Sequence, residues 1–331
     1  MSTAEKHPQS PALDRLTALW ALSEAGLGGV LHALRTPFTG LLVGGMAILL
    51  ISLIAQASPR PGRAILRALV VVLIIKALVS PHSPPTAYLA VGFQGLLGAT
   101  LFGGLGPRLA ALLLGPLALL ESALQKLLVL TLLFGQPLWT AVDAFMQSVG
   151  DTLPFLAGHP WLGSQGLIAL YVGGYALAGL LIGWLAGQLP ARIRAEQAQL
   201  PAVTLPPPAP PARRKRRGQR VLILLLTLGF LLLFQPEGGP PLLWLLLRVI
   251  LVLALWYLLV APALLWLLRR YLLKQRGQFE AEVAQALDML PLLRQYAWQA
   301  WRDSAPRRGP ARLWLFVIRL LAYTLQPPDA S

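Results

Sequence analysis

Two residue types are missing from this sequence. None of the 331 residues is cysteine, which excludes disulfide bonds, thiolate metal sites, iron–sulfur clusters, cysteine nucleophiles and lipidated cysteines. Asparagine is also absent, so the chain has no acceptor for N-linked glycosylation. Sequence motifs for an ATP-binding loop, a zinc protease, a serine hydrolase and a prenyl diphosphate enzyme are absent too. We therefore expect no enzyme and no resident cofactor, because catalysis would have to rest on isolated carboxylates.

Charge is scarce as well. Charged residues make up 12% of the chain and hydrophobic residues 56%, whereas soluble domains carry about 25% charged residues. Long apolar runs with few charges are typical of membrane spans. The polar residues 1–15 lack a basic segment followed by an apolar core, so we expect no cleavable signal peptide. The composition predicts an all-α, polytopic helical membrane protein.

Apolar runs near the required length of about 20 residues predict the membrane spans. In the first 190 residues these runs cover 39–57, 64–80, 87–105, 109–134 and 166–189. The segment 13–34 also carries Asp14, Arg15, Glu24 and His32, so it is a first span, a re-entrant helix or an interfacial helix. The segment 138–163 is polar enough to be an amphipathic helix and loop. If 13–34 crosses, the Gly-rich core at 1–190 has about six helices, which is the arrangement we prefer.

The rest of the chain divides into three regions. A Pro/Ala-rich and basic linker covers 191–220, including the cationic run 213–217. Two apolar runs, 221–234 and 242–268, predict a transmembrane hairpin at 221–268. A cytoplasmic or interfacial tail follows at 269–331, with amphipathic helices at 278–303 and 312–325. The first of these has an apolar stripe at helical spacing, formed by Phe279, Val283, Ala286, Leu290, Leu293 and Ala297.

Lysine and arginine in short loops predict the orientation, because such loops stay in the cytoplasm. The basic linker and the cluster at 269–276 are then cytoplasmic, as are the C-terminus and the loops with Arg60, Arg63 and Arg108. The loops with His82 and His159 lie outside. The linker is more consistent with contact to anionic lipid than with nucleic-acid binding. We expect the protein in a bacterial inner (cytoplasmic) membrane.

Several polar side chains lie inside the predicted spans, where charged groups are costly and tend to pair or face a cavity. Glu121 is near the middle of 109–134, and we expect it to pair with Lys76 or Lys126. Such groups form either a site for a small ligand or a proton, or a structural ion pair between helices. The candidate ligand-binding set is Lys76, His82, Gln94, Glu121, Gln125 and Lys126.

Two further patterns leave alternatives open. His82, His159, Asp143 and Asp151 share the predicted outer face, where they bind a divalent metal or remain solvated loop residues; the metal is unknown. Small residues also recur every four positions, which lets helix backbones approach closely. These stripes serve packing within this chain or docking to another membrane subunit. Their glycines are Gly40, Gly44, Gly95, Gly103, Gly179, Gly183 and Gly187.

The stretch 76–99, KALVSPHSPPTAYLAVGFQGLLGA, lies within the Gly-rich core. Together with that core, about residues 10–190, it resembles the membrane substrate-binding components of energy-coupling factor transporters. The resemblance implies capture of a vitamin, a vitamin precursor or a metal ion from the outer face. It also implies a transmembrane coupling subunit and cytoplasmic ATPases as partners. No binding role is carried over, because no family ligand motif matches residue by residue, and the region 220–331 is an addition to the family pattern.

Three functions are compatible with these features. The leading hypothesis is an uptake component for a small molecule, in which Glu121 and Lys126 supply charge and His82 and Gln94 orient the ligand. The first rival is a non-transporting membrane scaffold that binds a partner through its Gly-rich faces and its cytoplasmic tail. The second is an integral membrane enzyme acting on a lipid or isoprenoid.

Overall fold

The computed structural model describes residues 11–28, 39–80, 83–152, 159, 161–200 and 279–326, with a few isolated positions between 262 and 277. These residues are mainly helical and include no strand, which confirms the all-α class. The predicted hairpin at 221–268 and His82 lie outside the described residues, apart from isolated positions near 262–267. The elements are α1 (Pro11–Leu22), the π-helix η1 (Ser23–Leu27), α3 (Thr39–Gln56), α4 (Pro61–Val79), α5 (Pro85–Gly104), α6 (Pro107–Phe134), α7 (Gln136–Thr152), α8 (Ser164–Gln197), α12 (Glu280–Asp303) and α13 (Gly309–Leu325).

Four helices are long and apolar enough to cross a bilayer: α3, α5, α6 and α8, with 18 to 34 residues each. They match the predicted spans 39–57, 87–105, 109–134 and 166–189. Local sequence sets their ends, since α5 and α6 begin with proline at the first helical position and α6 ends before Gly135, which has a φ of 66°. Four such helices are typical of an integral membrane protein.

The predicted span 64–80 forms α4, which is not among these four candidates. It carries three cationic residues, Arg63, Arg67 and Lys76, within 19 residues. Its apolar face is nevertheless inside the protein, where Ile65, Val72 and Ile75 are fully buried. The helix is therefore an apolar core element, and its three charges are what separate it from the four candidate spans.

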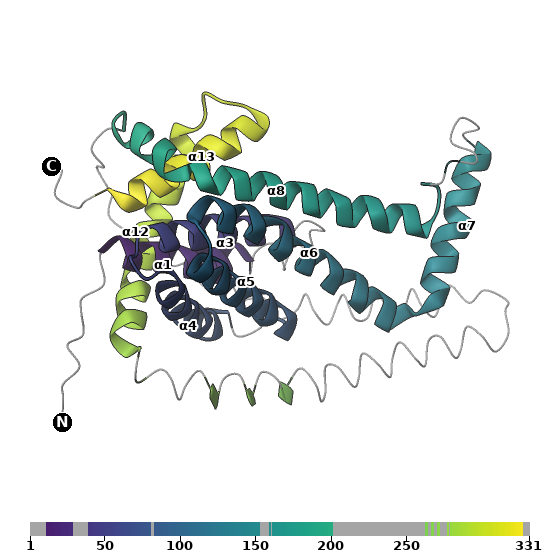
Figure 1. Ribbon diagram of the computed structural model, residues 1–331, viewed down its shortest axis with the longest axis horizontal. Coiled ribbons are helices and arrows are strands. Elements are labelled where there is room, and N and C mark those ends of the chain that lie inside the picture. The colour runs from purple at the N-terminus through teal and green to yellow at the C-terminus, as the bar shows by residue number, and fades with distance from the viewer. Residues whose placement is uncertain are drawn as a thin grey trace, which may run out of the picture.

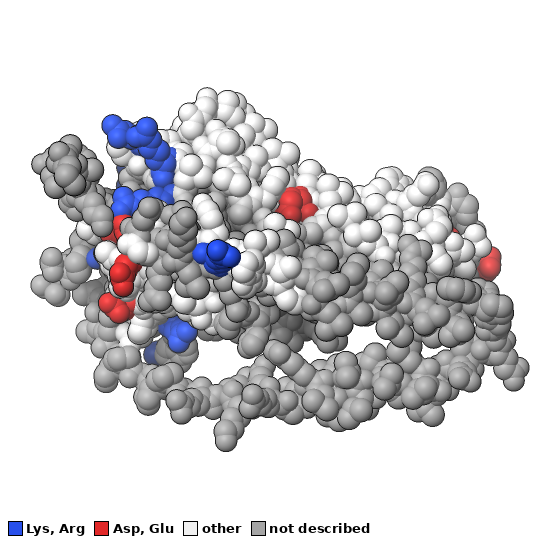
Figure 2. Space-filling model, turned by 90° about the horizontal axis from the view of Figure 1, so that it is seen from below, with Lys and Arg blue, Asp and Glu red and all other residues white. Residues whose placement is uncertain are grey.

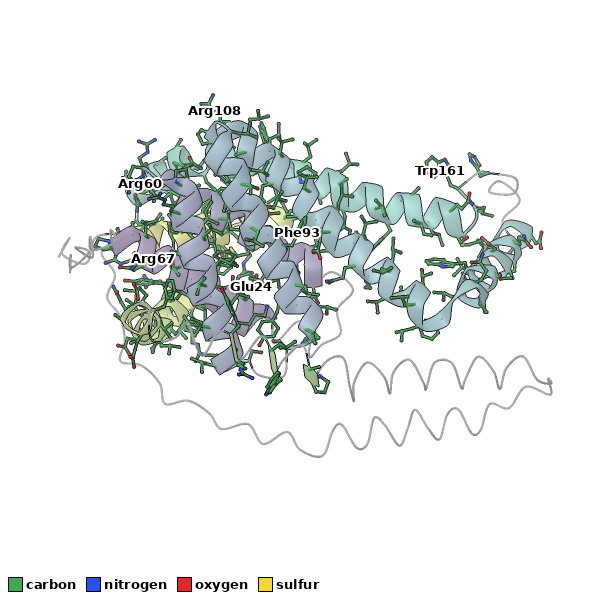
Figure 3. The ribbon with its side chains drawn as sticks, turned by 60° about the horizontal axis from the view of Figure 1, so that its bottom comes forward. Glu24, Arg60, Arg67, Phe93, Arg108 and Trp161 are labelled. Carbon is green, nitrogen blue, oxygen red and sulfur yellow. The ribbon has the colours of Figure 1, made fainter. Side chains whose placement is uncertain are left out.

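Figure 1 shows α3, α4 and α5 beside the longer pair α6 and α8. The pair continues past the other helices, and α7 runs across its far end. The helix and loop expected at 138–163 correspond to α7 and the turn before α8. Arg60 and Arg108 lie at one end of the molecule and Trp161 at the other (Figure 3). The bundle thus has a basic end and an opposite end that carries α7.

Glycines allow α6 and α8 to touch through their backbones. A methyl group added to Gly179 would lie 2.5 Å from the carbonyl oxygen of Gly115, and one added to Gly183 would overlap the carbonyl oxygen of Ala111. Among the described residues, the position added at Gly187 has only Arg108 nearby, and the position added at Gly103 has no neighbouring atom within 4 Å. The glycines of the predicted stripes therefore differ in role, and the α6–α8 contact depends on two of them.

Segment 13–34 is helical from its start to residue 28, as α1 followed by η1. All six residues from Leu16 to Ala21 are buried, because α1 packs against α3, α4, α12 and α13. An interfacial helix keeps one face in water. The buried surface of α1 matches a helix packed inside the assembly instead.

The two predicted tail helices are present as α12 and α13, and both pack on the core. The stripe on α12 is covered by the chain's own helices: Val283, Ala286 and Leu293 belong to the main apolar core. Ion pairs Arg67–Glu282 and Arg319–Glu196 connect the tail to α4 and α8. The region predicted as a linker from residue 191 is helical to Gln197, despite Pro190, because the end of α8 packs on α13.

Tyr323 of α13 also holds the tail together. Its hydroxyl donates a 2.6 Å hydrogen bond to Asp303 Oδ2 at the end of α12. Burial raises the pKa of the Tyr323 phenol above its usual range, and the adjacent Asp303 carboxylate raises it further. The phenol is therefore a neutral donor at any pH at which the protein is handled.

Substituting Gly179 with alanine should destabilise the protein by about 2 kcal/mol, because the new methyl group meets the α6 backbone, which cannot move aside. Gly174→Ala on the same helix is the matched control, since no neighbouring atom of the described part of the chain lies within 4 Å of its added methyl group. Alanine there should be neutral or slightly stabilising. Thermal unfolding of the purified variants in detergent measures both effects; equal melting temperatures would contradict the close α6–α8 contact.

Candidate ligand cavity

A cavity of about 360 Å³ lies between the helices of the bundle. Residues from η1, α3, α4, α5, α6 and α8 form its wall, so six elements of the first 200 residues meet there. Its polar lining residues are Glu24, Thr39, Lys76, Thr86, Gln94, Ser122, Gln125, Lys126, Tyr171 and Tyr175. The remaining wall is formed by small and apolar residues, mainly of α3 and α5.

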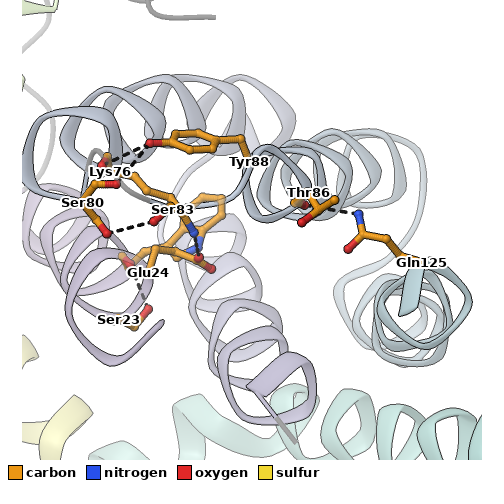
Figure 4. Close-up of polar contacts among 9 residues, drawn as sticks. Ser23, Glu24, Lys76, Ser80, Ser83, Thr86, Tyr88 and Gln125 are labelled. Atoms are coloured by element: carbon orange, nitrogen blue, oxygen red, sulfur yellow. Dashed lines mark hydrogen bonds and ion pairs between the residues drawn. The ribbon is translucent and has the colours of Figure 1, made fainter. Parts of the chain in front are cut away.

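An ion pair between Glu24 and Lys76 forms one side of the cavity (Figure 4). Lys76 Nζ donates to Glu24 Oε2 over 2.7 Å, and only 3% and 2% of the two side chains are exposed. The ammonium group also lies 5.8 Å from the centroid of the Tyr88 ring. The prediction that Glu121 pairs with Lys76 is therefore wrong. The partner of Lys76 is Glu24 of η1, which the predicted site did not include.

Besides the Tyr171 hydroxyl, two oxygen atoms on lining residues have no hydrogen-bond partner among the described residues. They are Glu24 Oε1 and Gln94 Oε1, and both side chains are almost completely buried. An unsatisfied buried polar group lowers the free energy of unfolding by about 1–3 kcal/mol, and such groups are therefore rare in folded proteins. Both groups are acceptors as placed, which favours a ligand or water that carries hydrogen-bond donors.

The α6 wall carries Ser122, Gln125 and Lys126. Gln125 Nε2 donates to the backbone oxygen of Thr86 over 3.3 Å, which connects α6 to the start of α5 (Figure 4). Glu121 precedes these residues but does not line the cavity. Its carboxylate interacts with the Ser122 hydroxyl, and its Oε2 atom is buried without a partner among the residues described. Glu121 is thus adjacent to the site rather than part of its wall.

Tyr171 and Tyr175 of α8 supply an aromatic wall. Their ring centroids are 4.8 Å apart and the rings are tilted by 48°. The sequence analysis missed both, because a tyrosine at helical spacing in an apolar span carries no signal that separates a ligand wall from ordinary packing. Glu24 did carry a signal, being a carboxylate within a largely apolar segment.

Small residues keep the cavity open. A methyl group on Gly44 would lie 3.2 Å from Gln94 Nε2 and 3.0 Å from Leu119 Cδ2, and one on Gly40 would lie 3.2 Å from Ser122 Cβ. These two glycines line the cavity as well as allowing α3 to approach α6. Gly95, by contrast, faces the side chain of Leu69 on α4.

The structure brings together four of the six predicted site residues: Lys76, Gln94, Gln125 and Lys126 all line the cavity. At the far end, Asp143 Oδ1 accepts a 2.6 Å hydrogen bond from the backbone N–H of Ser164, while Asp151 and His159 are exposed. Within the part of the chain that the structure describes, no three His, Asp or Glu side chains gather as a metal site would require.

Replacing Lys76 with methionine should lower the free energy of unfolding by about 3–5 kcal/mol, because it leaves the buried Glu24 carboxylate without its partner. The double variant Glu24→Gln/Lys76→Met removes both charges and should recover part of that loss. Arg63→Met on the same helix is the control; Arg63 is exposed, so its loss should change stability by less than about 0.5 kcal/mol. Denaturant titration in mixed micelles measures all three variants. A single Lys76 variant as stable as Arg63→Met would argue against the pair.

The chain was also compared with known proteins. No protein-family model, no curated protein and no solved structure matches it. The chemistry of the cavity is therefore the basis for the function proposed below.

Proposed function

We propose that this chain is a membrane component for uptake of a small molecule, which it binds in the cavity between η1, α3, α4, α5, α6 and α8. The observation that carries the proposal is a cavity whose wall combines a buried ion pair with buried oxygens that have no partner among the residues described. Polar groups at bilayer depth are costly and are typical of substrate or ion sites. In this proposal separate subunits supply the energy for uptake.

The size of the cavity supports a small ligand. Ligand pockets usually measure about 300–1,000 Å³, and this one is at the lower end of that range. An aromatic wall from α8 and polar groups from the five elements η1, α3, α4, α5 and α6 match the usual composition of such sites. A vitamin or vitamin precursor with N–H or O–H donors fits the acceptors Glu24 Oε1 and Gln94 Oε1.

The position of the cavity supports capture from the outer face. Its wall is formed in part by the start of α3, the end of α4 and the start of α5. Arg60 and Arg63 lie at the opposite end of the bundle, where α3 ends and α4 begins. Basic loops face the cytoplasm. With the basic end inside, the cavity lies toward the outside, in a core formed by α1 with η1 and the five helices α3, α4, α5, α6 and α8. This orientation also places the tail helices α12 and α13 in the cytoplasm.

Two observations favour the uptake component over the scaffold alternative. The scaffold alternative relied on the apolar stripe of α12 being available to a cytoplasmic partner. Val283, Ala286 and Leu293 are instead buried against the chain's own helices. The α8 glycines Gly179 and Gly183 are likewise used against α6. The uptake component is therefore the function that we propose.

The test is to purify the full chain from native membranes in mild detergent and to analyse both the intact complex and its denatured extract by mass spectrometry. Gln94→Leu should reduce a retained small molecule by about fivefold or more, because it removes a buried amide worth about 1–3 kcal/mol to the complex. Gln147→Leu, at an exposed position on α7, is the matched control and should retain the molecule. Co-purifying coupling and ATPase subunits would support uptake.

Two results would contradict the proposal. The first is an extract of the parent protein that contains no small molecule other than lipid and detergent. The second is equal retention by the Gln94→Leu and Gln147→Leu variants, since the molecule would then bind elsewhere. The substitution Ala90→Leu fills part of the cavity without removing a polar group, because Ala90 lines it. This variant should also retain less of the small molecule.

A further inference from the structure

A second hollow lies at the basic end of the molecule, away from the ligand cavity. It is a groove of about 600 Å³ between the start of α6 and the last third of α8. Two arginines, an indole and two leucines form most of its wall, together with one glutamine: Arg108, Leu109, Leu112, Trp184, Gln188 and Arg192. None of these residues takes part in the ligand cavity.

The two arginines of the groove have no anionic partner in the part of the chain that the structure describes. Arg67 and Arg319, by comparison, form ion pairs with Glu282 and Glu196. Arg192 Nη2 donates to Gln188 Oε1 over 3.1 Å, and its guanidinium lies 5.8 Å from the Trp314 ring. These contacts hold the guanidinium in place without neutralising it. Arg108 is exposed at the second position of α6, where the helix N-terminus adds partial positive charge.

Apolar surface begins directly beside these cations. Leu109 and Trp184 are each about half exposed, and Leu113 and Leu181 continue the exposed apolar surface one turn farther along each helix. Both helices are long and apolar enough to span a bilayer, so this surface faces acyl chains. Tryptophan is enriched where headgroups meet hydrocarbon. The groove therefore lies at the headgroup level, with the cations toward water and the leucines toward the bilayer.

In the view of Figure 2, the coloured Lys and Arg side chains gather toward the basic end of the molecule. A free phosphate would need only the cations, whereas a phospholipid also uses the indole and the leucines. Basic pockets between membrane helices on the cytoplasmic side bind anionic headgroups. We propose that the groove between α6 and α8 binds one anionic phospholipid, with its phosphate on Arg108 and Arg192 and its acyl chains along Leu109, Leu113 and Trp184.

Native mass spectrometry of the full chain in detergent tests this, with phosphatidylglycerol and phosphatidylcholine of identical acyl chains as probes. The parent protein should retain one tightly bound phosphatidylglycerol and at least tenfold less phosphatidylcholine. Arg108→Gln/Arg192→Gln should bind phosphatidylglycerol at least tenfold more weakly. Arg60→Gln/Arg63→Gln is the matched control, since it removes two exposed arginines at the same end of the bundle but outside the groove, and it should bind like the parent.

Three results would overturn the proposal. One is equal affinity of the parent for the two lipids, which needs no variant and so does not depend on variant folding. Another is an equal loss of phosphatidylglycerol affinity in Arg108→Gln/Arg192→Gln and in the control Arg60→Gln/Arg63→Gln, which would indicate a diffuse charge effect. The third is displacement of phosphatidylglycerol by millimolar inorganic phosphate, which would indicate an anion site without lipid contacts. The charge-preserving double variant Arg108→Lys/Arg192→Lys should bind phosphatidylglycerol with an affinity between those of the parent and the glutamine variant, because lysine lacks the bidentate geometry of arginine.

Discussion

The buried ion pair between Glu24 and Lys76 constrains how the first third of the chain can fold. Each charge is almost fully removed from water, and neither is tolerable there without the other. The pair therefore ties η1 to the end of α4, two segments separated by 52 residues. Because both residues line the cavity, the same interaction that fixes these helices also sets the electrostatic character of the proposed site.

The α6–α8 contact serves a different purpose. Gly115, Gly179 and Gly183 allow two backbones to meet without side chains between them, and such close approach leaves little room for sliding or rotation. The pair is a rigid support on which the other helices are placed. Both proposed sites use it: Ser122 and Tyr175 contribute to the ligand cavity, and Arg108 and Arg192 to the basic groove.

The four helices that are apolar enough to cross a bilayer could be predicted from the sequence, because apolar runs with few charges and residues such as Pro107 and Gly135 mark them directly. Gln94, Gln125 and Lys126 were identified because polar residues inside apolar spans are rare. The partner of Lys76 was not, since pairing between distant helices depends on packing that one sequence does not encode locally. Glu121 shows the same limit: hydropathy places it at bilayer depth, but only the rotation of α6 decides whether it lines the cavity. The helical conformation of the residues after Pro190 could not be predicted either, because it depends on packing against α13.

The unequal helix lengths have a consequence for the bilayer itself. At a rise of about 1.5 Å per residue, α3 and α5 are close to the roughly 30 Å of a hydrocarbon core, whereas α6 extends for about 42 Å. The part of α6 beyond the cavity still exposes leucines, at Leu128 and Leu132. Hydrophobic mismatch of this kind is relieved by tilting or by local thickening of the lipid. Both responses concern the α6–α8 side of the protein, so bilayer thickness becomes a variable that acts on the helices bordering the cavity.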